Sequence, residues 1–348
     1  MTPTGTSDRE RLGIGLAAVG RPAYITAGRV TDLGAERDVA TFRDRTFAVL
    51  DAAYAAGIRY VDAARSYGRA EEFLAAWLHR TPSLRSVDAS RSAVTLVRSL
   101  RSLTAHPEID DVVIGSKWGY RYVGDWQMDA ATHEVKDHSL AAFTRQWAQT
   151  SALLGERIGI YHVHSATLDS GVLDDAAVHR ALAGLRERGV RVGVSTSGPR
   201  QADAVRRALA VTVDGEPLFT SFQSTWNVLE PSAGSALAEA ADAGARVIVK
   251  EVVANGRLAP GGADSPSTHR VAELASEAGT TADALAIAAA LAQPWAWRVL
   301  SGAVDPAQVA SNAAAADRAL PETVAAELAG LAEDPETYWA ARSARPWT

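Results

Sequence analysis

The chain has 348 residues, of which 47% are hydrophobic and 22% charged, a globular composition with enough apolar material for a sizeable core. Its formal net charge of −6 argues against a nucleic-acid-binding protein, which normally carries a basic stripe, and the absence of cysteine excludes disulfides and thiolate chemistry. Residues 1–11 lack the apolar core of a signal peptide and no run of about 18 uncharged apolar residues follows, so we expect a soluble cytoplasmic protein without a membrane partner.

Short apolar segments rich in β-branched residues alternate with longer amphipathic segments along the chain. The segments predicted as strands are 11–17, 59–63, 111–117, 158–164, 190–195, 220–225, 246–251 and 298–302. The predicted helices are 45–56, 139–154, 174–188, 200–210, 234–243, 281–293 and 321–331. Gly57, Gly189 and Gly244 each follow a helical segment, where a glycine in the left-handed conformation typically ends a helix.

About eight alternations of strand and helix, without a break in composition, predict an α/β fold of the (β/α)8 TIM-barrel type. We expect one domain over residues 1–348, with a core at about 11–317 and a C-terminal helix and tail at 318–348. The competing fold, a doubly wound open sheet, normally carries G-x-G-x-x-G after its first strand. The third glycine of the run Gly13, Gly15 and Gly20 comes two places late, so we interpret Gly13 and Gly15 as glycines of a barrel strand.

Three connections are longer than ordinary loops, namely 20–41, 119–137 and 255–267. Each leaves the C-terminal end of a predicted strand, which is the face where TIM-barrel enzymes carry their active sites. Long loops confined to one face are more often functional than incidental. The sequence therefore predicts a site on that face.

Four ionisable side chains are predicted to meet there. Asp62, Lys117 and His164 end the second, third and fourth predicted strands, and Tyr67 lies in the short loop after the second. Each residue alone has an ordinary structural interpretation, such as a helix cap, a solvated charge or a packed ring. Four such residues at one level of a barrel favour a shared function.

The chemistry of these four residue types favours proton transfer to a carbonyl group. A nearby ammonium lowers the pKa of a tyrosine from its usual value of about 10, and a carboxylate keeps that ammonium charged. A neighbouring histidine hydrogen-bonds and orients a substrate carbonyl. We therefore predict carbonyl reduction by an external hydride donor, with Tyr67 protonating the developing alkoxide.

Segment 57–72, Gly-Ile-Arg-Tyr-Val-Asp-Ala-Ala-Arg-Ser-Tyr-Gly-Arg-Ala-Glu-Glu, resembles the signature of the aldo-keto reductase family, which carries a catalytic Asp and Tyr. Similar motifs follow in the family's order, namely Ile-Gly-Ser-Lys117, Ile-Tyr-His-Val-His164, Val-Gly-Val-Ser195, Phe-Gln223-Ser-Thr-Trp-Asn227, Ala254-Asn-Gly-Arg-Leu258 and Ser301-Gly-Ala. The resemblance spans about residues 11–317. It implies a TIM barrel that binds NADPH in an extended pose and interconverts an aldehyde, ketone or aldose with an alcohol.

The resemblance also implies a role for each matching residue. The catalytic tetrad would be Asp62, Tyr67, Lys117 and His164. The implied cofactor-binding residues are Ser195 and Gln223 at the nicotinamide carboxamide, Gly256 and Leu258 at the pyrophosphate, and Gly302, Gln308 and Asn312 at the adenine end. Thr196 departs from this pattern, because the family usually has Asn after the serine of the fifth strand.

Two further departures concern the cofactor. Lys250 and Glu251 stand where an aromatic residue usually stacks on the nicotinamide. We count Lys250 among the cofactor-binding residues and regard Trp226 as a candidate substitute ring. Val304, followed by Asp305, stands at the position that reads the 2′-phosphate. A carboxylate is unfavourable near that phosphate, so NADH is an alternative to NADPH.

Aromatic residues near the predicted mouth of the barrel indicate a small-molecule site. Trp118 and Trp226 are the predicted substrate-binding residues, and Tyr120, Tyr122 and Trp126 lie close to them in the loops. Such a lining suits a sugar ring and an apolar carbonyl about equally. The physiological direction of the reaction and the oligomeric state are left open.

Two further polar residues need a separate interpretation. His162 shares the strand face of His164 one layer deeper, and we interpret it as a buried, hydrogen-bonded core histidine. Arg65 has two interpretations, a contact to an anionic substrate or a salt bridge at the rim. The remaining histidines lack metal-ligand spacing with carboxylates, so we predict no metal site.

Two alternative functions stay open at this point. The first is a lysine Schiff-base aldolase on the same barrel, with Lys117 as the nucleophile, which the presence of Tyr67 together with Asp62 disfavours. The second is a catalytically weak nicotinamide-binding sensor or partner subunit. The departures at Lys250 and Val304 make this second function conceivable, whereas the intact tetrad argues against it.

Overall fold

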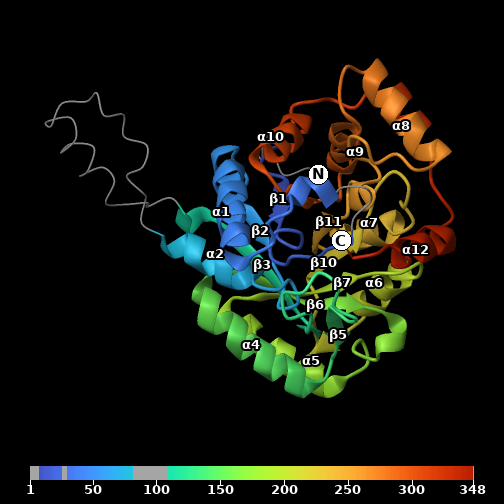
Figure 1. Cartoon of the computed structure of the whole chain (residues 1–348). Helices are drawn as coiled ribbons and strands as arrows, with labels where there is room; N and C mark the ends of the chain where they lie inside the picture. The colour runs from blue at the N-terminus through green and yellow to red at the C-terminus, as the bar shows by residue number, and fades with distance from the viewer. Residues whose placement is uncertain (1–7, 26–29, 81–108, 348) are drawn as a thin grey trace, which may run out of the picture.

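The computed structural model describes residues 8–25, 30–80 and 109–347. Its centre is a closed barrel of eight parallel strands, which confirms the predicted (β/α)8 fold (Figure 1). The barrel strands are β1 (Leu12–Gly15), β2 (Tyr60–Asp62), β3 (Val113–Trp118), β6 (Ile158–Ala166), β7 (Arg191–Thr196), β10 (Ser221–Thr225), β11 (Arg246–Lys250) and β12 (Arg298–Ser301). Each strand pairs with its neighbours in chain order, and β12 closes the barrel on β1.

Helices surround the barrel on its outer face (Figure 1). Those described are α1 (Val39–Ala55), α2 (Ala70–His79), α4 (Leu140–Leu154), α5 (Ala176–Ala183), α6 (Gln201–Leu209), α7 (Gly234–Asp242), α8 (Pro266–Glu277), α9 (Ala282–Leu291), α10 (Pro306–Ala315), α11 (Glu322–Ala329) and α12 (Pro335–Ser343). The predicted helix 174–188 is divided, because α5 ends at Gly184 and residues Arg186–Arg188 form a separate 3₁₀ turn. Gly57, Gly189 and Gly244 all have positive φ, as expected of residues that end a helix.

Four helices are absent from the prediction, namely α2, α8, α10 and α12. Three of them start with one signature, a capping side chain followed by proline at the first helical position. Ser265, Asp305 and Asp334 cap α8, α10 and α12, each accepting a hydrogen bond from a backbone N–H of the first turn. This signature was visible in the sequence, because proline is favoured at the first position and Ser or Asp before it.

The barrel interior is filled by a layer of large side chains. Tyr60, Ile160, Ile248 and Leu300 form a buried apolar cluster contributed by β2, β6, β11 and β12. A Cβ atom on Gly115 would lie 2.1 Å from the Tyr60 hydroxyl, and one on Gly13 would lie 2.8 Å from the Tyr60 ring. Glycine at these two positions therefore makes room for the Tyr60 side chain, and the interpretation of Gly13 as a barrel-strand glycine is confirmed.

Segments from both ends of the chain gather over the C-terminal ends of the strands. The predicted loop 119–137 contains a hairpin of β4 (Tyr120–Tyr122) and β5 (Glu134–Lys136). Trp347 forms an isolated antiparallel bridge with Ile25. A second small hairpin, β8 (Thr212–Val213) with β9 (Glu216–Pro217), lies between α6 and β10.

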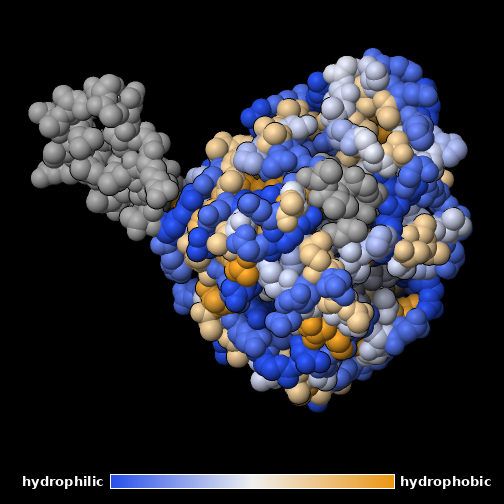
Figure 2. Space-filling model, in the orientation of Figure 1, coloured by the Kyte–Doolittle hydropathy of each residue, from blue (hydrophilic) through white to orange (hydrophobic). Residues whose placement is uncertain are grey.

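The surface seen in Figure 2 is mainly hydrophilic, with isolated hydrophobic residues. Among the described large apolar side chains, Val123, Val135 and Leu140 are the exposed ones. Single exposed apolar residues of this kind are normal on soluble domains. None of the described helices is long and apolar enough to cross a bilayer.

Candidate active site

Asp62, Lys117 and Tyr67 form one hydrogen-bonded group at the C-terminal ends of β2 and β3. Lys117 Nζ donates to Asp62 Oδ2 at 2.5 Å, to the carbonyl of Ala63 at 3.0 Å and to Tyr67 Oη at 3.2 Å. Asp62 pairs with Gly115 in the parallel register, so Lys117 lies two residues further along the neighbouring strand and on the same face. The strand register therefore brings Asp62 and Lys117 together, and the short loop after β2 carries Tyr67 to them.

His164, near the end of β6, completes the group. Its ring lies edge-to-face against the ring of Tyr67, with centroids 5.5 Å apart, and its Nδ1 is 3.3 Å from the hydroxyl of Ser66. The side chains of Tyr67 and His164 line the same cavity. All four residues predicted from the strand ends thus meet at one end of the barrel.

The pKa of Tyr67 differs in direction from the sequence prediction. Burial, and then the negative charge of Asp62, raise the pKa of Tyr67 well above its usual value of 10. The expected lowering by Lys117 is wrong for the protein without ligands, because the ammonium is paired at 2.5 Å with Asp62 and the phenol is desolvated. Tyr67 therefore holds its proton throughout the neutral range, which is the state a general acid requires.

Burial and the cations Lys117 and Arg21 lower the pKa of His164 well below 6.5. The imidazole is therefore neutral at physiological pH and able to donate one hydrogen bond and accept another. His162 has no exposed surface, and its Nε2 lies 3.0 Å from the hydroxyl of Ser221. Burial and Lys117 lower the pKa of His162 to about 3, so its interpretation as a hydrogen-bonded core histidine is confirmed.

Gln223 on β10 connects the catalytic group to the opposite wall of the cavity. Its Nε2 donates to Asp62 Oδ1 at 2.8 Å, while its Oε1 is buried and has no hydrogen-bond partner among the described residues. Gln223 lines the cavity, and a buried amide oxygen without a partner is a candidate acceptor for a bound ligand. Ser195 lies outside the lining, and its hydroxyl accepts a hydrogen bond from the backbone N–H of Ser165 at 2.8 Å.

The cavity has a volume of about 290 Å³, near the lower end of the range of roughly 300–1,000 Å³ typical of small-molecule sites. It runs from the catalytic group toward the ends of β11 and β12. Of the predicted cofactor-binding residues, those that line it are Gln223, Lys250, Gly256, Gly302 and Gln308. Leu258 instead packs in an apolar cluster with Tyr338 and Trp339, and Asn312 is buried between Ser301 and Asp283.

Lys250 and Glu251 bring two charged groups to the cavity wall at the end of β11. Lys250 Nζ donates to the hydroxyl of Thr225 at 2.7 Å and lies 3.7 Å from Glu251. Arg342 of α12 holds both carboxylate oxygens of Glu251, with one contact at 2.9 Å. Burial, opposed by Glu251, lowers the pKa of Lys250 to about 8. Arg342 and Lys250 outweigh the cost of burial and lower the pKa of Glu251 to about 2.

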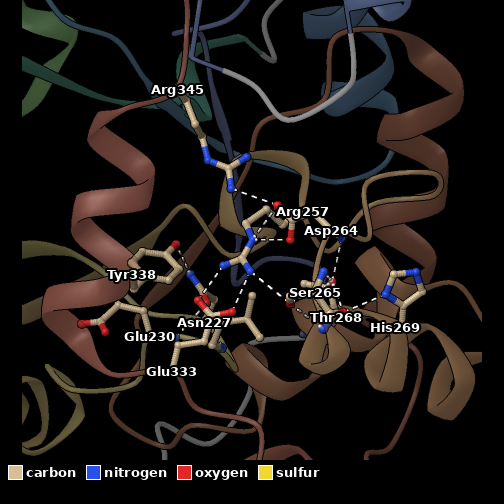
Figure 3. Close-up of polar contacts among 11 residues, drawn as sticks. Asn227, Glu230, Arg257, Asp264, Ser265, Thr268, His269, Glu333, Tyr338 and Arg345 are labelled. Atoms are coloured by element: carbon tan, nitrogen blue, oxygen red, sulfur yellow. Dashed lines mark hydrogen bonds and ion pairs between the residues drawn. The ribbon is translucent and has the colours of Figure 1, made fainter.

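A second set of ion pairs fastens the loop after β11 to the C-terminal segment (Figure 3). Arg257, which is 8% exposed, binds Asp264 at 2.8 Å and both carboxylate oxygens of Glu333, at 2.6 and 2.7 Å. Arg345 adds a contact to Asp264 at 3.1 Å. Because this loop carries Gly256 to the cavity wall, the Arg257 contacts help to position that wall.

The predicted substrate-binding residues Trp118 and Trp226 lie outside the cavity lining, and that prediction is corrected here. Trp118 has no exposed surface and packs against Phe143 at a centroid distance of 5.2 Å, while Trp226 packs against Trp295 at 5.8 Å. The strand alternation that carries Lys117 into the barrel turns its neighbour Trp118 outward toward the helices. Of the aromatic residues expected at the mouth, Tyr120 lines the cavity.

Trp126, also expected at the mouth, anchors its loop against the helices. Its indole N–H donates to the carbonyl of Arg37 at 2.6 Å, and its ring packs on Phe42. Arg65 forms an ion pair with the buried Glu71 at 2.5 Å, so the rim salt bridge is the interpretation that the structure supports. In the described part of the chain, no group of three or more His, Asp or Glu side chains is arranged to hold a metal ion.

The sequence analysis missed four residues that line the cavity beside Tyr67, namely Arg21, Tyr24, Glu134 and Trp347. They come from the loop after β1, from β5 and from the end of the chain. No periodicity or motif singles them out, because their proximity arises from loops rather than from strand register. The long loops that carry three of them, 20–41 and 119–137, were the available signal.

The chain is similar to known proteins in both sequence and fold. The model of the Aldo/keto reductase family matches residues 32–333. Among solved structures, the aldo-keto reductase AKR11C1 from Bacillus halodurans is 19% identical, with a TM-score of 0.64 over 93% of this chain and 92% of that chain. The glycerol dehydrogenase AKR11B4 from Gluconobacter oxydans is 19% identical, with a TM-score of 0.64 over 92% and 90%.

A third structure, an aldo/keto reductase from Klebsiella pneumoniae in complex with NADP and acetate, is 21% identical, with a TM-score of 0.60 over 92% of this chain and 90% of that chain. At these identities the structures are evidence for the fold alone. No curated protein matches the chain.

Proposed function

The chain belongs to the aldo/keto reductase family, and from that premise we propose that it is an NAD(P)H-dependent oxidoreductase that interconverts a carbonyl group and an alcohol. The observation that carries the proposal is the position of the Tyr67 hydroxyl. It lies 3.2 Å from Lys117 Nζ, which Asp62 holds in place, and it shares a cavity with His164. We assign Tyr67 the role of general acid in reduction and general base in oxidation.

The groups that line the cavity suit parts of a nicotinamide dinucleotide. The buried Oε1 of Gln223 has no hydrogen-bond partner in the described ranges and is an acceptor suited to the N–H group of a carboxamide. Gly256 and Gly302 place backbone without side chains on the wall, where phosphates approach closely. When bound, the reduced cofactor supplies the hydride. We propose that Gln223 and Lys250 lie at the nicotinamide end and that Gly256, Gly302 and Gln308 lie toward the adenine end.

Side chains of this protein supply the proton for the reacting carbonyl and orient that carbonyl. Tyr67 is protonated in the neutral range, since burial and Asp62 raise its pKa, and it donates that proton to the oxygen of the reacting carbonyl as negative charge develops there. The ammonium of Lys117 hydrogen-bonds the phenol oxygen and favours the phenolate that results. The neutral imidazole of His164 orients the carbonyl by a hydrogen bond.

We propose NADPH as the cofactor, as in the Klebsiella pneumoniae structures in complex with NADP and with NADPH. One observation favours NADH instead. Asp32 lines the cavity and accepts a hydrogen bond from Gln308 Nε2 at 3.1 Å, and a carboxylate there suits a free ribose hydroxyl better than a phosphate. Titration with both reduced cofactors decides between them.

The Schiff-base alternative is disfavoured by the surroundings of Lys117. Its ammonium makes three hydrogen bonds, to Asp62, Ala63 and Tyr67, and the side chain lies outside the cavity lining. A lysine nucleophile requires a neutral amine with access to the substrate. Borohydride inactivation in the presence of a carbonyl compound, without nicotinamide, is the result that would favour the aldolase.

Replacement of Tyr67 by Phe tests the proposal. We expect Tyr67→Phe to lower kcat by about 10²- to 10⁴-fold, the usual contribution of a positioned general acid, while the cofactor Kd stays within about twofold. The measurements are oxidation of the reduced cofactor with a panel of aldehydes and ketones, and cofactor titration by tryptophan fluorescence.

Tyr60→Phe is the matched control for this test, because Tyr60 is also buried inside the barrel and its hydroxyl has no partner among the described residues. We expect the control to keep wild-type activity. Full activity in Tyr67→Phe would refute the assigned acid. Cofactor binding without turnover of any carbonyl by the wild type would support the sensor function instead.

A further inference from the structure

The strand that carries His164 is irregular at that residue. Two residues of β6, His164 and Ser165, face Ser195 of β7, because the register between the two strands shifts at this point. Ser165 has a φ of +49°, a left-handed conformation that a residue with a side chain seldom adopts. On its other edge, the pairing of β6 with β3 ends at Val163. His164 therefore lies in a β-bulge, a feature that re-aims side chains next to active sites.

Two side chains hold the backbone where the ladder of the barrel is interrupted. The carbonyl of His164 lies 2.8 Å from Nε2 of His138, and the backbone N–H of Ser165 donates to the hydroxyl of Ser195 at 2.8 Å. These are the two polar groups of the peptide bond that follows His164. The direction of this peptide, and with it the position of the His164 side chain, therefore depends on His138 and Ser195.

The roles of donor and acceptor in the His138 contact are fixed. A carbonyl oxygen only accepts, so Nε2 of His138 carries the proton and donates it. Nδ1 of the same ring is buried and has no hydrogen-bond partner among the described residues. Burial lowers the pKa of His138 to about 4, so the ring is neutral at physiological pH. His138 therefore donates to the His164 carbonyl throughout the neutral range.

The surroundings of His138 hold its ring in place. Residue 119 is a glycine with a φ of +111°, and a Cβ atom on it would lie 2.3 Å from Cδ2 of His138. The rings of Trp118 and Tyr120 lie edge-to-face against that of His138, with centroids 5.9 and 6.3 Å away. The next residue, Ser139, caps α4 by accepting a hydrogen bond from a backbone N–H of its first turn. Gly119 thus makes room for a ring that the start of α4 keeps in position.

Resting on the proposed function, we propose that His138 and Ser195 are positioning residues for His164. They act through the peptide of the bulge and place the imidazole where it orients the reacting carbonyl. Both residues lie outside the cavity lining, so their effect on the reaction passes through His164. This role of Ser195 differs from the carboxamide contact that the family resemblance implies.

The first test removes the His138 hydrogen bond and then restores it. His138→Phe keeps a ring between Trp118 and Tyr120 but loses the donor, whereas His138→Gln keeps an N–H group at about the reach of Nε2. With a panel of aldehydes, we expect kcat/KM to fall about tenfold in His138→Phe and to lie within about threefold of the wild type in His138→Gln, because small misplacements of an orienting group are costly. The cofactor Kd should stay within about twofold. A Gln variant that is as impaired as the Phe variant overturns the proposal.

Ser195→Ala removes the acceptor of the Ser165 N–H and separates two roles for this serine. A positioning role predicts that kcat/KM falls by about threefold or more while the cofactor Kd is unchanged. A contact to the nicotinamide carboxamide predicts weaker cofactor binding instead. The second result would overturn the assignment of Ser195.

His179→Phe is the matched control for His138→Phe. His179 is also buried, its Nε2 lies 2.9 Å from the backbone carbonyl of Val172, and it lies outside the cavity lining. We expect the control to lower the melting temperature about as much as His138→Phe does, since both lose one bond of the same kind, but to keep the kcat/KM of the wild type. An equal loss of kcat/KM in the two variants would assign the effect to general damage and overturn the proposal.

A double-variant cycle distinguishes positioning from a purely structural role. Because His138 acts through His164, its substitution has no imidazole left to misplace in the His164→Ala background. We therefore expect the tenfold effect of His138→Phe to shrink to about twofold or less in that background. Effects of the two substitutions that multiply in the double variant contradict a positioning role.

An NMR measurement keeps this inference independent of turnover. In protein with labelled histidine, His164→Ala identifies the ring signal of His164, which reports on the rings of Tyr67 and Tyr120 at 5.5 and 5.1 Å. We expect this signal to move in His138→Phe and to lie close to its wild-type position in His138→Gln. An unmoved signal in His138→Phe overturns the positioning role and leaves the proposed oxidoreductase intact. A moved signal in a protein that turns over no carbonyl supports the positioning of His164 and refutes the proposed reaction.

Discussion

The two ends of the cavity beside Tyr67 are built in different ways. At the catalytic end, Asp62, Lys117 and His164 come from three neighbouring strands, with Lys117 two residues beyond the partner of Asp62 and His164 two residues beyond the partner of Lys117. At the mouth, Arg21 comes from the loop after β1, Glu134 from β5, and Trp347 from the last residues of the chain. The mouth is held by ion pairs, ring contacts, the β4–β5 hairpin and the bridge between Ile25 and Trp347 rather than by the ladder of the barrel.

The difference suits the two ends to different tasks, proton transfer at the catalytic end and selection among substrates at the mouth. Parallel hydrogen bonding fixes strand residues within a fraction of an ångström, which suits proton transfer between defined atoms. Loop residues change without disturbing the barrel, which suits selection among substrates. Changes at the catalytic end should therefore lower turnover of every substrate, whereas changes at the mouth should alter substrate preference, stability or pH dependence.

The largest effect is expected from Lys117→Met, which keeps the length of the side chain but removes its ammonium. Asp62 then loses the partner at 2.5 Å, and Tyr67 Oη loses its donor at 3.2 Å. We expect kcat to fall by about 10²- to 10³-fold with every carbonyl compound, because the phenolate is no longer stabilised. Steady-state kinetics with hydroxylated and apolar aldehydes measure both the loss and its uniformity.

Lys117→Met also leaves a buried carboxylate without its cation, so stability falls together with activity. The double variant Asp62→Asn/Lys117→Met removes both charges and separates the two effects. We expect it to regain most of the lost melting temperature but none of the lost activity. Recovery of kcat in the double variant would mean that Lys117 acts through folding alone.

The catalytic end and the mouth also differ in how well the sequence predicts them. Asp62, Lys117 and His164 were predictable because each ends a strand, and strand ends of a closed barrel meet at one face. Trp118 was misplaced because a one-residue step along β3 turns a side chain from the barrel interior to the helices. The direction of the Tyr67 pKa shift was not predictable, because burial outweighs a cation already paired with Asp62.

The mouth was not predictable from residue types. Arg21 and Glu134 occupy long loops without periodicity, and their 2.6 Å contact depends on how both loops fold over the barrel. Trp347 reaches the cavity through a bridge with Ile25, a pairing between the two ends of the chain that no local pattern indicates. Helices α8, α10 and α12, in contrast, were missed despite a recognisable start of a capping residue followed by proline.

A smaller effect is expected from Arg257→Leu in the loop after β11. The substitution removes the contact to Glu333 and one of the two arginine contacts to Asp264, because Arg345 still binds that carboxylate (Figure 3). We expect a loss of about 2 kcal/mol of stability, less than for a fully buried pair, because Asp264 is 39% exposed and water replaces part of the contact. Thermal unfolding measures this loss.

Arg206→Leu provides the comparison for Arg257→Leu, since Arg206 forms an ion pair with Glu239 on the exposed surface. We expect little change in its melting temperature, because exposed ion pairs contribute little. Arg257→Leu should also raise KM for the cofactor through the loop that carries Gly256, while kcat stays close to that of the wild type. Equal melting temperatures for the two variants would show that the Arg257 contacts do not fasten the loop.

The smallest effect is expected from Lys250→Met, and it appears only in the pH profile. Burial lowers the pKa of Lys250 to about 8. The other shifted groups of the described cavity titrate far from there, since the pKa of Tyr67 is raised well above 10, that of Glu251 is lowered to about 2 and that of His164 is lowered well below 6.5. Lys250 is therefore the group among them that changes charge between neutral and mildly alkaline pH.

The direction in which kcat/KM changes with pH follows from the positive charge of Lys250. Below about pH 8, the ammonium of Lys250, together with Lys117 and Arg342 and opposed by Glu251, places positive potential near the oxygen that gains negative charge in reduction. As the pH rises through about 8, that charge is lost, so kcat/KM for reduction should fall by about two- to fivefold. Lys250→Met should remove this step and stay at the alkaline level throughout. If the step near pH 8 persists in Lys250→Met, another group is responsible for it. The charge of Lys250 would then serve the structure, as the ion pairs of the mouth do, rather than the reaction.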